Sequence, residues 1–183
     1  MLDSTVVSLR LPKEHPLLLK DRLVRATLDD VKTETRRVGS AAKRWLKAEA
    51  GDILWVREAW GVTTANPPRI VFRSDGEEAD VEAWRPSIHL ARVNARLRLE
   101  LLEKPWMEPL QDITEDGAMA EGVEARPDDT SLMGLDEYLG AEGEWFGSAR
   151  YAFASLWDSI NVPRGYGWEK NPDVAVLRYR RLP

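Results

Sequence analysis

The chain has 183 residues, a formal net charge of −5 at pH 7, two histidines and no cysteine. This length fits a single domain that can bury a core, and the lack of cysteine excludes disulfides, cysteine nucleophiles and thiolate metal sites. Because only His15 and His89 offer imidazole groups and no phosphate-binding glycine loop occurs, we expect neither a metal nor a cofactor. The N-terminal residues do not resemble a secretory signal, and no apolar run approaches the roughly 18 residues of a spanning helix. We therefore expect a cytoplasmic protein without a membrane segment.

Charge is distributed unevenly along the chain. Twelve acidic residues and one basic residue lie between Glu108 and Glu144, whereas the remainder contains 25 basic and 19 acidic residues. The overall negative charge argues against an extended surface for duplex nucleic acid. The main body has either a basic face or an ordinary mixed surface.

Apolar spacing predicts the elements of the first half of the chain. Residues 1–16 contain two prolines and are expected to form an N-terminal extension or an edge strand. A short helix is predicted at 21–30, with Asp21 as its N-cap. Three further elements are predicted: a helix at 40–49 and strands at 53–56 and 70–72.

Stronger patterns follow in the second half. Alternating apolar residues predict a strand at 93–101. A helix capped by Asp112 or Thr114 is expected to run to Glu121, with Gly122 in the left-handed conformation beyond it. Residues 123–147 are acidic and glycine-rich and are expected to form an insertion or loop. Two more elements are predicted: a helix that begins at Ser148 and a strand at 174–179.

These elements imply one α+β domain at 17–183 that contains the acidic insertion. About six short strands with three or four flanking helices indicate a compact, barrel-like sheet.

The segment from Val31 to Val38 concentrates reactive side chains. Lys32, Thr35 and Arg37 place an amine, a hydroxyl and a guanidinium within six residues. In a regular strand, Lys32 would point away from Thr35. If the two act together, the backbone between them must turn or bulge, so the regular strand is expected to begin only after Thr33. The alternative is an exposed strand with charges on its solvent face.

The order of these motifs resembles the ASCH domain family of the PUA-like superfamily. Residues 30–37 resemble its Gly-x-Lys-x-x-Thr-x-Arg motif, with Asp30 in place of the glycine. Residues 51–60 look like its Gly-Asp-x-Leu-x-Val strand, in the Arg-Glu-x-Trp form associated with phage and prophage members. Further matches lie at 84–89, 110–122, 156–161 and 165–168, so the resemblance covers most of residues 18–181. It implies a PUA-like mixed β-barrel with a cleft for a nucleobase, nucleoside or RNA ligand.

The resemblance also implies a reaction. Small ASCH members hydrolyse the acetyl amide of N(4)-acetylcytidine with a lysine, a threonine and a glutamate, and these match Lys32, Thr35 and Glu121 as candidate catalytic residues. A threonine hydroxyl needs a base to take its proton, and a lysine can do so if its pKa falls from about 10.4 toward 7 to 8. A carboxylate beside Lys32 favours the charged ammonium, so desolvation must offset Glu121 or Glu121 must hold a proton. Arg37 could stabilise an oxyanion.

Six side chains are candidates for substrate binding: Arg37, Arg57, Glu58, Trp60, Trp84 and Trp168. Arg57 and Glu58 follow a buried strand and either line the cleft or pair with each other. The three tryptophans lie in irregular segments, where an aromatic ring can stack on a base.

Two other functions fit the same sequence. The protein is alternatively a non-catalytic RNA-binding module, with Lys32 as an anion clamp and Arg37 as a binding or ion-pairing group. A third interpretation is a phage accessory protein that contacts a protein partner through residues 123–147. The same segment is alternatively a lid over the cleft.

Overall fold

The computed structural model describes residues 10–76, 80–126 and 136–183. The predicted N-terminal extension at 1–16 and the predicted insertion at 123–147 therefore lie partly outside the described residues. Within the three ranges, no helix combines the length and apolar character needed to cross a membrane.

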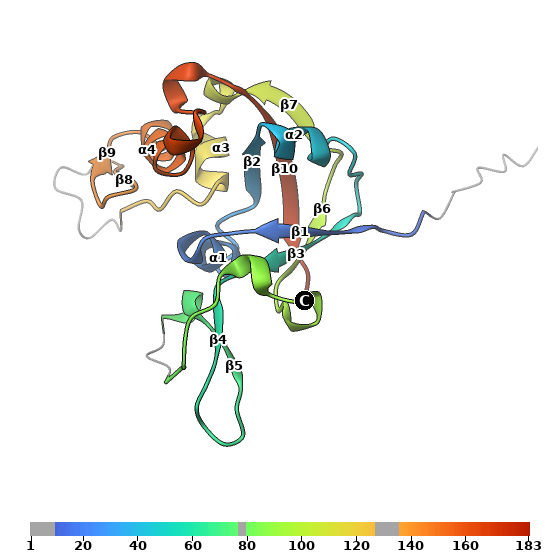
Figure 1. Cartoon of the computed structure of the whole chain (residues 1–183). Coiled ribbons are helices and arrows are strands. Elements are labelled where there is room, and N and C mark those ends of the chain that lie inside the picture. Colours follow the sequence, from blue (N-terminus) through green and yellow to red (C-terminus); the bar gives the residue numbers. More distant parts are fainter. Residues whose placement is uncertain (1–9, 77–79, 127–135) are drawn as a thin grey trace, which may run out of the picture.

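A curled, mixed sheet of six strands forms the centre of the fold (Figure 1). Its path runs through β1 (Glu14–Leu18), β3 (Ile53–Arg57), β6 (Arg98–Leu101), β10 (Asp173–Arg181) and β2 (Glu34–Val38), and β7 (Trp106–Pro109) also pairs with β10. Strands β1 and β3 are parallel, and the other neighbours are antiparallel. Because β1 and β2 are the two ends of this path, the sheet forms half a barrel.

Strand β10 is the axis of this sheet. β2 pairs along one edge of it, whereas β7 and β6 pair in succession with its first and last residues. Its run Val174 to Leu177 is fully buried, as expected for a strand that is covered on both faces. Together with the helices that cover it, this mixed sheet confirms the predicted α+β class.

Four α-helices cover the sheet: α1 (Asp21–Leu28), α2 (Ser40–Trp45), α3 (Glu115–Ala120) and α4 (Ala149–Asn161). Helices α1 and α2 pack with β1, β3 and β6 in one apolar cluster, which includes Trp45 and Leu54. Helices α3 and α4 pack with the ends of β2 and β10 in a second cluster, which includes Phe153 and Trp157. The region between these two clusters contains the candidate site.

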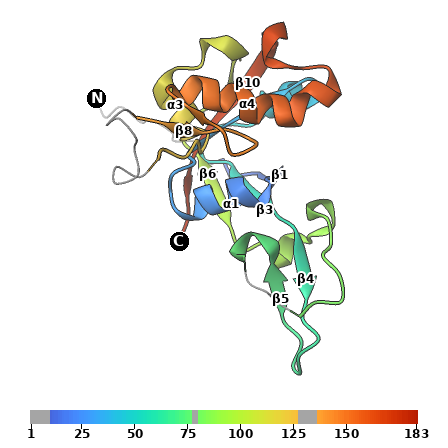
Figure 2. The same ribbon diagram turned by 90° about the vertical axis from the view of Figure 1, so that its left-hand side faces the viewer.

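Two small antiparallel ribbons lie outside the main sheet. The hairpin of β4 (Trp60–Val62) and β5 (Ile70–Phe72) projects from one end of the molecule (Figure 2). The second ribbon, β8 (Tyr138–Leu139) with β9 (Trp145–Phe146), belongs to the predicted insertion. Its described part is anchored to α4, because Ala141 N–H donates to Ser155 Oγ at 3.1 Å. Of the two alternatives expected for this segment, an insertion or a loop, the described part is thus an insertion with a two-stranded ribbon of its own.

Local signals placed several boundaries correctly. β2 begins at Glu34, as expected from a change in backbone direction after Lys32. Thr114 caps α3 by accepting from Gly117 N–H at 3.0 Å, and Gly122 has φ +88°. Ser148 is the N-cap residue of α4.

Other boundaries differ from the predictions. The strand expected at 93–101 begins only at Arg98, because 92–94 form a short 3-10 turn in which Val93 is 89% exposed. The N-cap of α1 is Lys20 rather than Asp21. Helix α2 ends at Trp45, four residues before the predicted end. β1 starts at Glu14 and thus crosses the predicted boundary between the extension and the domain.

Candidate functional site

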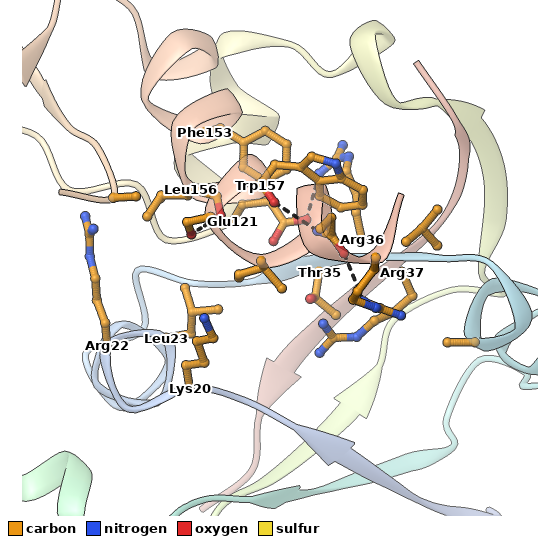
Figure 3. Close-up of a pocket in the computed structure, with 17 residues that line it drawn as sticks. Lys20, Arg22, Leu23, Thr35, Arg36, Arg37, Glu121, Phe153, Leu156 and Trp157 are labelled. Atoms are coloured by element: carbon orange, nitrogen blue, oxygen red, sulfur yellow. Dashed lines mark hydrogen bonds and ion pairs between the residues drawn. The ribbon is translucent and has the colours of Figure 1, made fainter. Parts of the chain in front are cut away.

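A cavity of about 240 Å³ lies between β2, α1 and α4 (Figure 3). Its apolar wall consists of Leu23 from α1 and of Phe153, Leu156, Trp157 and Ile160 from α4. The α4 residues lie on one helix face because they follow the i, i+3, i+4, i+7 spacing. The same spacing that builds the core thus leaves a concave apolar surface beside the sheet.

Thr35 and Glu121 also line this cavity. Thr35 comes from β2 and Glu121 from the residue that follows α3, and both residues are buried, at 2% and 7% exposure. The cavity therefore presents a hydroxyl and a carboxylate inside a largely apolar enclosure, where electrostatic interactions are stronger than in water.

Five cationic residues contribute to the same lining: Lys20, Arg22, Arg36, Arg37 and Arg164. Glu121 is the single carboxylate residue among the described lining residues. Arg37 donates to the carbonyl of Leu18 at 2.9 Å, and Arg164 donates to Asn161 Oδ1 at 2.9 Å. In the described part of the chain, neither guanidinium has a carboxylate within ion-pair distance. The excess positive charge suits an anionic group or a developing oxyanion.

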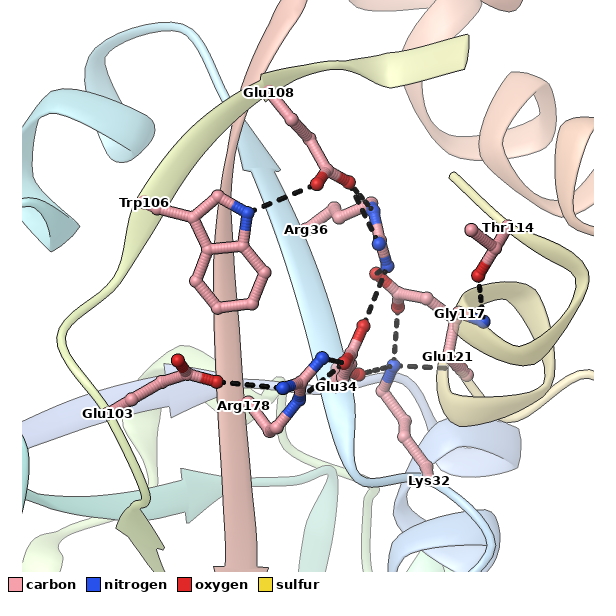
Figure 4. A network of polar contacts seen from close by, with 10 residues as sticks. All are labelled: Lys32, Glu34, Arg36, Glu103, Trp106, Glu108, Thr114, Gly117, Glu121 and Arg178. Carbon is pink, nitrogen blue, oxygen red and sulfur yellow. Dashed lines mark hydrogen bonds and ion pairs between the residues drawn. The ribbon is translucent and has the colours of Figure 1, made fainter. Parts of the chain in front are cut away.

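Lys32 contacts Glu121 but does not itself line the cavity (Figure 4). Its Nζ donates to Glu121 Oε2 at 2.6 Å, to the Glu121 carbonyl at 2.8 Å and to the Glu34 carbonyl at 2.7 Å. An ammonium has three hydrogens and no acceptor, so these three contacts match the protonated form. Lys32 is fully buried and is not among the residues that line the cavity.

Burial and charge act in opposite directions on Lys32. Desolvation lowers the pKa of its ammonium, the carboxylate of Glu121 raises it, and the nearby Arg37 and Arg36 lower it further. The net direction is downward. Desolvation of Lys32 thus offsets the increase in its pKa that the neighbouring carboxylate causes.

A buried polar network holds Glu121 from its other side. Arg36 Nη1 lies 3.4 Å from Glu121 Oε1 and 3.3 Å from Glu34 Oε2. Arg36 also contacts Glu108 at 2.8 Å, and Arg178 contacts Glu34 at 2.6 Å. Opposite charges alternate through this network in Figure 4. Such alternation offsets part of the cost of burying each charge.

The structure brings together four of the residues predicted from the sequence. Thr35, Arg37 and Glu121 line one cavity, and Lys32 reaches it through Glu121. Asp30, which replaces the motif glycine, has φ +57°. It adopts the left-handed conformation that glycine would favour, and its carboxylate pairs with Arg181 at 2.7 Å.

The predicted pair Arg57 and Glu58 lies elsewhere. Glu58 is fully buried and pairs with Arg96 at 3.0 Å, whereas Arg57 donates to the carbonyl of Ile88. The prediction that the two either line the cleft or pair with each other therefore fails for the described cavity. Arg57 is the last residue of β3 and Glu58 follows it, so the buried strand was predicted correctly but the directions of these two side chains were not.

The three candidate tryptophans also lie outside the 240 Å³ cavity. Trp60 is 8% exposed in β4, with the Arg85 guanidinium 4.9 Å from its ring centroid. Trp168 packs against Phe153 at a ring-centroid distance of 6.2 Å. Trp84 lines a neighbouring cavity. The expectation that all three lie in irregular segments is wrong for Trp60, which begins a strand.

Several residues of the site could not be identified from the sequence. In a regular strand Arg36 would point away from its neighbour Thr35, yet its side chain contributes to the cavity and holds Glu121. Lys20 and Arg22 come from the start of α1, and only the three-dimensional arrangement shows that they face α4. The sequence predicts the helix that begins at Ser148, but it does not show that one face of this helix lines a cavity.

Within the described ranges, no group of three or more His, Cys, Asp or Glu side chains has a geometry suited to a metal ion. Comparisons of the chain with family models, with curated proteins and with solved structures found no match.

Proposed function

We propose that the protein is an ASCH-domain member with a PUA-like half-barrel, and that its cavity binds an N(4)-acylated cytosine and hydrolyses the acyl amide. The observation that carries this proposal is that Thr35 and Glu121 line the same apolar cavity. Apolar walls accept a flat base, and the few polar groups in such a site fix the orientation of the ligand. A cavity of this size has room for a single nucleobase with its acyl group.

In this reaction, Thr35 Oγ attacks the acyl carbonyl carbon and forms a new C–O bond. The proton of the hydroxyl passes to the Lys32–Glu121 pair, in which a 2.6 Å contact links the two groups. This pair holds its proton jointly, as strongly coupled groups do. Glu121 faces the cavity, and Lys32 acts through it as a positioning and charge-balancing residue.

The carbonyl oxygen becomes negatively charged as the bond forms. Arg37 supplies positive charge at the cavity wall, which stabilises this oxyanion. Collapse of the intermediate breaks the C–N bond, and the proton held by the Lys32–Glu121 pair passes to the amine of the leaving cytosine. Water then hydrolyses the acyl ester on Thr35 and releases the carboxylic acid.

A second candidate function is recognition of an RNA base without turnover. The observation that favours it is the set of three hydrogen bonds from Lys32, since an ammonium with all hydrogens engaged has no lone pair to accept a proton. In that case Lys32 and Arg36 fix the Glu121 carboxylate, which then accepts a hydrogen bond from the exocyclic amine of a cytosine or adenine.

Incubation of the purified protein with N(4)-acetylcytidine, followed by chromatography, separates the two candidates. The amidase predicts time-dependent formation of cytidine that is lost in Glu121→Gln. Glu142→Gln is a matched control, because Glu142 is exposed and does not line the cavity. If high concentrations of folded protein bind the nucleoside but release no cytidine, the amidase proposal is wrong and recognition alone is favoured.

A further inference from the structure

A second cavity adjoins the first one. It measures about 550 Å³ and lies between the start of α1 and the segment 84–87. Lys20 and Arg22 line both cavities. In Figure 3 these two side chains lie on the side of the first cavity away from Arg36 and Arg37. The two cavities thus have the side chains of Lys20 and Arg22 in common.

The second cavity is also rich in positive charge. Its lining contains Lys20, Arg22, Arg73 and Arg85, against one carboxylate residue, Asp21. Asp21 is engaged, because it pairs with Arg73 at 2.6 Å. Such an excess of cations attracts a polyanion.

Two of these cations lack a carboxylate partner. Lys20 is exposed and makes no side-chain hydrogen bond or ion pair with any residue that the structure describes. Arg85 lies over the Trp60 ring and has no ion pair within the same ranges. Lys20 stands between the two cavities, which is the position that a phosphate joining two successive nucleotides would occupy.

The second cavity also contains an aromatic side chain. Trp84 lines it and is partly exposed, beside Arg85 and Pro86. An accessible indole ring offers a stacking surface for a base, and an adjacent guanidinium offers a contact for the phosphate or the base plane. Aromatic and cationic groups in one groove are typical of sites for single-stranded nucleic acid.

We propose that the two cavities form a continuous site for a single-stranded RNA segment. The target cytosine occupies the 240 Å³ cavity, and a neighbouring nucleotide stacks on Trp84 with its linking phosphate at Lys20. The identity of the target base rests on the proposed function, whereas the second subsite rests on the charge and shape of the 550 Å³ cavity alone. The natural substrate class is thus an RNA strand rather than a free nucleoside.

The test compares N(4)-acetylcytidine with short RNA oligonucleotides of three to five nucleotides that contain one acetylated cytidine, with the neighbouring nucleotides on either the 5′ or the 3′ side. Binding is measured by calorimetry at several salt concentrations, and cytidine release is measured by chromatography. One of the two oligonucleotide series is expected to bind at least about tenfold more tightly than the nucleoside, from one stacked base and one phosphate contact.

Variants assign this gain to the second cavity. Trp84→Ala should lower oligonucleotide affinity at least about fivefold and leave nucleoside affinity unchanged. Lys20→Gln should reduce the slope of log affinity against log salt by about 0.7, as expected for one lost phosphate contact with a single strand. Lys47→Gln is the matched control for charge, because Lys47 is exposed and lines neither cavity. Trp145→Ala serves likewise for the indole.

The outcomes separate this inference from the proposed function. Turnover of the nucleoside without tighter binding of any oligonucleotide overturns the RNA subsite and leaves the amidase intact. Oligonucleotide binding that depends on Trp84 and Lys20, without turnover, supports the subsite and overturns the amidase. Equal losses in the variants and in their controls, or binding that ignores salt, also overturn the subsite. Binding of an acidic peptide with the same dependence on Trp84 would assign the groove to a protein partner instead.

Discussion

Lys32 and Glu121 are 89 positions apart in the sequence, and their side-chain nitrogen and oxygen lie 2.6 Å apart in the fold. This contact joins the residue that precedes β2 by two positions to the residue that follows α3. The Lys32 ammonium has no hydrogen left to donate to a ligand, because its three hydrogens go to Glu121 and to the Glu34 carbonyl. The pair therefore fixes the position of the Glu121 carboxylate, which lines the cavity.

Substitution of Thr35 tests the nucleophile. Thr35→Ala removes the hydroxyl but keeps the buried position in β2, so turnover of N(4)-acetylcytidine should fall at least about 100-fold while affinity changes little. Thr35→Ser keeps a hydroxyl and should retain measurable turnover. Chromatographic rates and calorimetric affinities at the same pH provide the comparison.

Thr33→Ala is the matched control for this experiment, because Thr33 lies two residues earlier and does not line the cavity. It should retain the wild-type rate. Unchanged turnover in Thr35→Ala would eliminate Thr35 as the nucleophile and favour direct attack by water with Glu121 as the base.

A double-mutant cycle tests the buried pair. Lys32→Met leaves Glu121 buried without its nearest cation and should lower the free energy of unfolding by about 3–5 kcal/mol. Glu121→Gln in the same background removes the uncompensated charge, so the double variant should be more stable than Lys32→Met alone. Urea denaturation at pH 7 measures the free energy of unfolding of the wild type, the two single variants and the double variant. Additive losses would show that the two side chains are not energetically coupled.

Short-range sequence signals predicted the polar residues of the site better than the residues that form the walls of the cavity. Lys32, Thr35 and Arg37 lie in one segment, and the requirement that the backbone turn between Lys32 and Thr35 correctly located the start of β2. Thr114 and Gly122 likewise marked the ends of α3, because caps depend on local hydrogen bonds and on backbone conformation.

The remaining features depend on long-range packing. Val93 fits the alternation of a strand but is 89% exposed, since no strand in the described part of the chain pairs with residues 92–94. Glu58 follows a buried strand as predicted, yet Arg96 from a distant segment determines where its carboxylate lies. Tertiary contacts such as these outweigh local propensity and periodicity, so no pattern within one segment could reveal the cavity or its cations.

Acid sensitivity should arise at Asp52, far from the cavity. Burial raises the pKa of this carboxyl. Hydrogen bonds from the backbone N–H groups of Lys13 and Glu49 and from the side chains of His15 and Arg10 lower it by a larger total amount, so the net direction is downward. The folded pKa is then below the unfolded value of about 3.9. The stabilisation from Asp52 is therefore fully present above that value and is lost as pH falls through the folded pKa.

Asp52→Asn separates this contribution from general acid effects. The variant should be less stable than wild type at pH 7, and the difference should shrink as pH decreases from 5 toward 2.5. Urea denaturation at four pH values gives the dependence of the free energy of unfolding on pH for each of the two proteins. Parallel curves for the two proteins would show that Asp52 does not control the acid response. Asp136→Asn, at an exposed position, should follow the wild-type curve.

Gly122 should be needed for both stability and the geometry of Glu121. Its φ is +88°, and a Cβ at this position would lie 3.1 Å from the Cβ atoms of Ala26 and Lys32. Gly122→Ala therefore adds backbone strain of about 1–2 kcal/mol and a steric contact against Lys32, which holds the Glu121 carboxylate.

Gly143→Ala is the matched control, because Gly143 has φ +91° but nothing within 4 Å of an added Cβ. Both variants share the cost of the left-handed backbone, so a larger loss in Gly122→Ala measures the packing contribution alone. We expect the difference to reach about 1 kcal/mol by urea denaturation, together with reduced turnover of N(4)-acetylcytidine only in Gly122→Ala. Equal losses of stability and activity in the two variants would mean that the close approach of Gly122 to Lys32 has no role in positioning Glu121.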